Sequence, residues 1–228
     1  MSTNLPPAAA LLKATIAHTA PYIPQTDNLG GSNDWRDLYY VLDYFTFAVD
    51  KAYPQIPCAK GCGHCCDTQL FRVSRAEWET FRQGLDAMPA PARAEILNRA
   101  KDTFGPHREA LEGLAAHWSA GEPAPATIHD QAPVRCPSLG TDGRCMNYEH
   151  RPAICRGYGY FSATVAGTPS LLICRQEGPG WIRHLEATAV EQFPMPNWNP
   201  IQRQIDTLNP SGEIKPLPLW LLDAEPTP

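Results

Sequence analysis

The chain has 228 residues, which suits one domain of ordinary size whose hydrophobic core needs no disulfides to fold. It carries 19 Lys and Arg against 24 Asp and Glu, and no block of like charge stands out. Nucleic-acid binding requires a basic face, so we expect no nucleic-acid partner.

The N-terminal sequence MSTNLPPAAALLK has no positively charged start and only a short apolar run, so we expect no secretory signal. No stretch approaches the roughly 18 apolar residues of a membrane span, so we expect no membrane partner. A cytoplasmic, reducing location follows, in which clustered cysteines are more often metal ligands than disulfides. A periplasmic protein with disulfides is the alternative.

Residues 1–31 are rich in Pro, Ala, Thr and Gly, and they are predicted to form a partly disordered N-terminal arm. Residues 32–228 are predicted to be a single cysteine-cluster domain with a helical insertion at about 86–130. Apolar residues recur at three and four positions in several segments, which predicts helices. These helices are expected at 35–53, 74–85, 91–104, 106–119, 180–193 and 200–208.

The helix after Ser74 is expected to open with a capping box formed with Glu77. A short strand is predicted at 69–73, and a hairpin is predicted from the runs 157–165 and 171–174. Asn199 is expected to cap the last helix. The chain from Pro210 onward is expected to be irregular, with an apolar patch at 217–222 that docks on the core. The fold class is therefore mainly α with a small β-hairpin, with helices packed around a cysteine-rich, loop-built metal-binding core.

Eight cysteines fall into two groups, and the first places four of them within nine positions as C-A-K-G-C-G-H-C-C. Thiolates gathered this closely usually share a soft metal ion or a cluster. We therefore predict that all eight cysteines are metal ligands. They are Cys58, Cys62, Cys65, Cys66, Cys136, Cys145, Cys155 and Cys174.

The spacing favours an iron–sulfur cluster, most simply [4Fe–4S], over zinc. Zinc sites usually take two C-x2-C knuckles, whereas only Cys62 and Cys65 have this spacing. The adjacent Cys65 and Cys66 would point to opposite sides of an extended backbone, so they reach one ion only through a sharp bend. They could instead serve two metals or one extended cluster, or one of them could be a non-ligand. Zinc stays an alternative, and copper(I) is a weaker one.

The segment C-x3-C-x2-C also has the spacing of radical S-adenosylmethionine enzymes. The chain lacks the repeated strand–helix pattern that such a barrel requires, and five further cysteines would be unexplained.

The chain resembles the zinc- or iron-chelating family that is named for its C-x-x-C-x-x-C-C motif. The resemblance rests on the first cysteine group and on C-P-S-L-G-T-D-G-R-C-M-N-Y-E-H-R-P-A-I-C-R. One departure is that three residues, not two, separate Cys58 from Cys62. The resemblance implies metal binding. The cysteine motif is also similar to that of flagellin lysine N-methylases, which are thought to use an iron–sulfur cluster.

Arg151 and Arg156 flank Cys155 and are predicted to bind the cofactor, because a guanidinium offsets thiolate charge and donates hydrogen bonds. Ordinary ion pairs with acidic residues are the alternative. No catalytic residue can be assigned, since hydrolase, P-loop and Rossmann motifs are absent from the sequence. Two functions remain open: an enzyme with a redox or methyl-transfer role, and a metal-binding module for structure, storage or sensing. The partners are metal ions and an unidentified protein or small-molecule substrate.

Overall fold

The computed structural model describes residues 7–54, 58, 62–122, 131–165, 167–173, 178–180, 183 and 194–224. The chain divides into two compact units. The N-terminal unit comprises residues 1–60 and 156–205, and the cysteine unit comprises residues 61–155 and 206–228. Helices dominate, and the described strands form two small antiparallel pairs, so the predicted fold class is confirmed. The predicted arm and insertion boundaries stay predictions.

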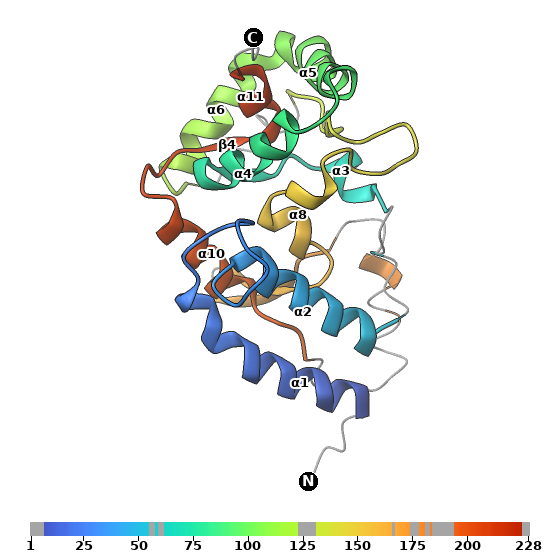
Figure 1. Cartoon of the computed structure of the whole chain (residues 1–228), viewed down its shortest axis with the longest axis vertical. Helices are drawn as coiled ribbons and strands as arrows, with labels where there is room; N and C mark the ends of the chain where they lie inside the picture. The colour runs from blue at the N-terminus through green and yellow to red at the C-terminus, as the bar shows by residue number, and fades with distance from the viewer. Residues whose placement is uncertain are drawn as a thin grey trace. The chain divides into compact units, whose positions relative to one another are not determined.

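The N-terminal unit begins with α1 (Pro7–Thr19) and the 3-10 helix η1 (Ala20–Gln25). Helix α1 lies alongside α2 (Leu38–Ala52) (Figure 1). Helix α2 begins later than predicted because Asp37 caps it. The buried Asp37 carboxylate accepts hydrogen bonds from the backbone amides of Gly30, Ser32 and Tyr39, each at 2.8 Å.

The predicted hairpin is present in the N-terminal unit as β2 (Ser162–Val165) and β3 (Thr168–Leu171). Its second strand begins three residues before the predicted one, because Gly167 with a φ of 81° is already part of the turn.

Helix α10 (Trp198–Leu208) corrects the predicted cap. The Asn197 side chain accepts the Asn199 amide at 2.8 Å, so Asn197 is the capping residue. The Asn199 side chain instead accepts a hydrogen bond from the Thr164 amide and donates one to the Thr164 carbonyl. The helix predicted near 180–193 lies mostly outside the described residues.

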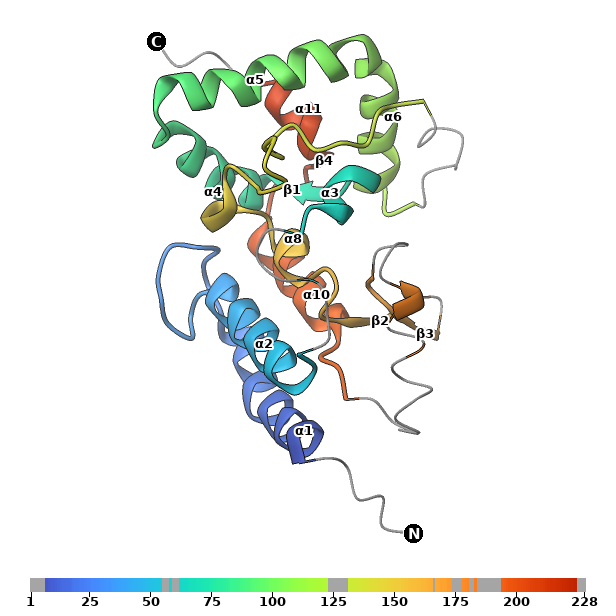
Figure 2. The same cartoon turned by 90° about the vertical axis from the view of Figure 1, so that its right-hand side faces the viewer.

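The cysteine unit is built around two tryptophans in a helical core. Helix α11 (Leu217–Leu222) packs against both α5 (Ala90–Phe104) and α6 (Arg108–Ser119) (Figure 2), and β1 (Arg72–Ser74) pairs antiparallel with β4 (Ile214–Pro216). Trp220 packs on Trp78 and donates its indole N–H to the Val73 carbonyl at 2.9 Å. The elements are α3 (His64–Thr68), β1 (Arg72–Ser74), α4 (Arg75–Asp86), α5 (Ala90–Phe104), η2 (Gly105–His107), α6 (Arg108–Ser119), η3 (Tyr148–His150), β4 (Ile214–Pro216) and α11 (Leu217–Leu222). Helix α8 (Ala153–Gly157) begins in this unit.

Two predictions for this unit differ from the structure. The strand predicted at 69–73 is present as β1 but begins three residues later. The chain after Pro210 is not irregular, because it forms β4 and α11. Five successive residues of α11, 217–221, are buried, and an apolar run without polar positions shows no helical period. The other helices of the unit agree closely with their predicted bounds, and the capping box of Ser74 and Glu77 is present.

Candidate metal centre

Cys136 and Cys145 are brought together by a narrow loop that pairs with itself. The Met146 amide donates to the Ser138 carbonyl at 2.8 Å, and Leu139 forms an antiparallel bridge with Cys145. Loss of water around the Cys136 thiol raises its pKa to about 12, and the charge of Cys145 acts in the same direction. The two thiols are therefore close enough to affect each other's ionisation.

Cys65 and Cys66 lie on the short helix α3, where the backbone bend places their adjacent thiols in contact. The Cys66 thiol donates a hydrogen bond to the Cys65 sulfur, which lowers the pKa of Cys65 and raises that of Cys66. The Cys66 carbonyl accepts the Cys136 amide at 2.7 Å. The first cysteine group is thus joined to the second by the backbone itself.

Cys155 belongs to the same neighbourhood. Burial raises the pKa of its thiol well above the usual value, and the charges of Cys136, Cys65 and Cys145 raise it further. Five half-buried thiols therefore interact electrostatically within the cysteine unit. We call these five the thiol cluster: Cys65, Cys66, Cys136, Cys145 and Cys155. Within the described ranges, no three Cys, His, Asp or Glu side chains converge on one point as the ligands of a single ion would.

The other predicted ligands are placed differently. Cys62 is half-buried in the cysteine unit, one residue before the Gly63 cap of α3. Cys58 belongs to the N-terminal unit, where it packs against the apolar cluster of Leu12 and Val49. Cys174 lies outside the described residues. The role of these three cysteines stays a prediction.

The two arginines that flank Cys155 have different environments. Arg151 lies over the Tyr148 ring at 3.7 Å, and its Nε donates to the Cys155 carbonyl at 3.3 Å. Its positive charge contributes to the lowered pKa of Cys65 and opposes the larger effects that raise the pKa of Cys155. Arg156 is buried in the N-terminal unit, where it makes the ion pair left open by the sequence, with Asp43 at 2.6 Å.

Glu77 is a site residue that sequence reasoning identified only in part. Its buried carboxylate accepts the amide and hydroxyl of Ser74 at 2.8 and 2.7 Å, completing the predicted capping box. It also accepts the Ala153 amide at 3.0 Å, which is the first amide of the helix that carries Cys155. The pKa of Glu77 is raised, because the effect of burial outweighs the opposing effect of these hydrogen bonds. One carboxylate therefore fixes the start of both helices.

Two further contacts hold the cysteine segments together. A Cβ atom added at Gly63 would lie 2.9 Å from the Gly143 carbonyl oxygen and 2.9 Å from a Leu139 methyl group, so only glycine allows this approach. Asp67 forms an ion pair with Arg135 beside Cys136. The sequence offered no indication of either pairing, because both partners come from the distant second group.

The described part of the structure thus gathers five interacting cysteines in one unit. A family model described as "CxxCxxCC: Putative zinc- or iron-chelating domain" matches residues 57–174. The match spans more than half of the chain, so the chain belongs to this family, and the family description supports metal binding. Searches of curated proteins and of solved structures find no match. In the parts of the chain that the structure describes, no helix has the length and apolar character that crossing a membrane requires.

Replacing Glu77 with Gln should lower the free energy of unfolding by about 1–3 kcal/mol. The NH2 group of glutamine cannot accept a hydrogen bond, so either the Ser74 donors or the Ala153 amide would lose their acceptor. Urea denaturation followed by tryptophan fluorescence measures this. Glu79→Gln on the same helix is the matched control, and it should lose less than about 1 kcal/mol, since Glu79 makes only exposed ion pairs. Equal losses in the two variants would show that Glu77 has no special role.

Replacing Gly63 with Ala should destabilise the protein by about 1–3 kcal/mol, because the added methyl group meets the Gly143 backbone. Gly105→Ala is the control, since nothing lies within 4 Å of the added Cβ and the φ of −53° suits alanine. That variant should be unchanged or up to about 1 kcal/mol more stable. The same denaturation assay compares them, and an unchanged Gly63→Ala variant would argue against the close approach.

Proposed function

We propose that the thiol cluster holds an iron–sulfur cluster, most simply [4Fe–4S]. The observation that carries this proposal is the interaction of five thiols, including an adjacent pair, within one unit. A tetrahedral zinc ion accepts four ligands and usually takes them from separated knuckles. A [4Fe–4S] cluster also takes four thiolates, but each thiolate binds a different iron. Adjacent cysteines can therefore bind neighbouring irons without converging on one ion.

The donor chemistry fits such a group. Sulfur ligands select soft metals and iron–sulfur clusters, and they bind as thiolates. The pKa of Cys136 and that of Cys155 are raised by burial, so these thiols keep their protons until a cation replaces them. Metal loading should therefore release protons.

The residues around the thiols have distinct roles in this proposal. Arg151 supplies positive charge, and its ring contact and hydrogen bond with Tyr148 hold it in place. A cation near bound thiolates favours the reduced state. Glu77 fixes the helix of Cys155, and the Asn147 side chain donates to the Phe81 carbonyl of α4 at 2.8 Å. When bound, the cluster would supply electron transfer or a Lewis-acidic iron, which suits a redox or methyl-transfer role.

A second candidate is a zinc- or iron-chelating module without catalysis. The description of the matched family favours it, because that description names chelation and no reaction. The same thiols would serve, with structural, storage or sensing roles. For either function we propose a cytoplasmic location, because thiolate sites persist in a reducing compartment.

Purification without oxygen, followed by iron, labile sulfide and zinc analysis, distinguishes the two metals. We expect a brown protein with about four irons and four sulfides per chain, since one [4Fe–4S] cluster contains that number. A colourless protein with stoichiometric zinc and no labile sulfide would contradict the iron–sulfur proposal. That result would support the chelating module instead.

A further inference from the structure

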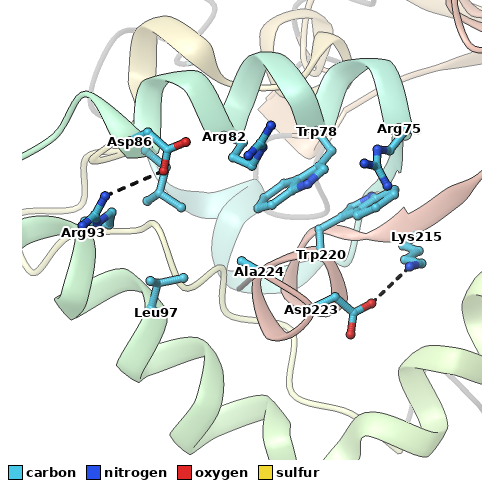
Figure 3. Close-up of a pocket in the computed structure, with 11 residues that line it drawn as sticks. Arg75, Trp78, Arg82, Asp86, Arg93, Leu97, Lys215, Trp220, Asp223 and Ala224 are labelled. Atoms are coloured by element: carbon cyan, nitrogen blue, oxygen red, sulfur yellow. Dashed lines mark hydrogen bonds and ion pairs between the residues drawn. The ribbon is translucent and has the colours of Figure 1, made fainter. Parts of the chain in front are cut away.

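A pocket of about 340 Å³ opens on the cysteine unit between α4, α5, β4 and α11 (Figure 3). Its size is at the lower end of the range of roughly 300–1,000 Å³ for small-molecule sites. Leu85 and Leu97 contribute apolar walls, and the two packed tryptophans Trp78 and Trp220 contribute an aromatic one. No member of the thiol cluster lines it.

The aromatic wall is rigid. The rings of Trp78 and Trp220 are stacked, with centroids 5.7 Å apart and planes inclined by 7°. The indole hydrogen bond from Trp220 to Val73 fixes one of them. Both residues are almost fully buried, so only part of each ring can face the pocket. Trp78 also stacks on Phe81, and Trp220 lies under Arg75 and Lys215, so the ring edges are the parts that an apolar group can contact.

The lining has an excess of positive charge. It contains four cations, Arg75, Arg82, Arg93 and Lys215, against the two carboxylates of Asp86 and Asp223. Lys215 is paired with Asp223 at 3.1 Å and Arg75 with a glutamate outside the lining. Both cations also lie over the Trp220 ring, at 4.5 and 5.5 Å. These two are therefore held at one end of the pocket.

Arg82 and Arg93 are the cations best placed to bind an added group. The closest atoms of Arg93 and Asp86 are 3.8 Å apart, which is too long for a hydrogen bond. Arg82 bonds Glu79 through Nε and one Nη, while a guanidinium has five N–H groups. Figure 3 shows Arg82 on α4 between Trp78 and Asp86, with Arg93 facing Asp86 from α5. Two guanidinium groups thus border the apolar wall.

We propose that this pocket binds a small organic anion with a carboxylate or phosphate head on a planar apolar body. Arg82 and Arg93 bind the head through charge-assisted hydrogen bonds. The body packs against the edge of Trp78 and against Leu85 and Leu97. This site is separate from the thiol cluster, and the proposal does not depend on which metal the thiols hold.

Calorimetric titration of the full-length protein with phenyl phosphate, 3-phenylpropionate and the neutral 3-phenylpropanamide tests the class of ligand. We expect saturable binding of at least one anion, weakened by added salt, and binding of the amide at least about tenfold weaker. The two anions distinguish a phosphate head from a carboxylate head. Absence of saturable binding by both anions, or equal binding of the amide, would overturn the proposal.

The location is tested with variants and with indole N–H signals in nuclear magnetic resonance. The double variant Arg82→Gln with Arg93→Gln should bind the preferred anion at least about tenfold more weakly. Arg36→Gln, which removes an exposed, ion-paired arginine of the N-terminal unit, should bind as the unaltered protein does. The signals of Trp78 and Trp220 should shift on titration, and that of Trp35 should not. The shifts are measured on the unaltered protein, and the affinity is compared between that protein and the double variant. Retained affinity in the double variant, or no shift at the two pocket tryptophans, would contradict this location.

Discussion

The carboxylate of Glu77 joins two parts of the cysteine unit that are 76 residues apart in the sequence. It caps α4 through Ser74 and, with its other oxygen, accepts the first amide of α8. A buried carboxylate is unfavourable unless its oxygens are bonded, and here three donors satisfy it. The position of Cys155 relative to the core of the cysteine unit therefore depends on this carboxylate. Cys155 belongs to the thiol cluster only while α8 is held in this way.

Charge is the second constraint on the thiol cluster. Thiolates placed together in a region of low water content repel one another, so their pKa values rise and most stay protonated. A metal cation removes this repulsion and converts thiols to ligands, while Arg151 offsets part of the remaining negative charge. The raised pKa values of Cys136 and Cys155 therefore mean that these two thiols lose their protons most readily when a cation takes their place.

Local patterns predicted most of the helices because apolar periodicity and capping residues lie within one segment. The capping box of Ser74 and Glu77 was predicted for this reason. The Ala153 bond of Glu77 was not, since no local pattern encodes a partner from a distant segment. Cys65 and Cys66 were considered in extended backbone, whereas the helical turn of α3 brings their thiols together. The same limit applies to Gly63, whose close contact with Gly143 exists only after folding.

The central claim is that the five thiols form one site that supplies four ligands to one cluster. Single serine variants at each of the five cysteines, purified without oxygen and analysed for iron and labile sulfide, test it most directly. Four variants should lose most of the iron, and the one that keeps it should be a member of the adjacent pair, Cys65 or Cys66. Full retention of iron and sulfide in the variants of Cys136, Cys145 and Cys155 would contradict a shared site.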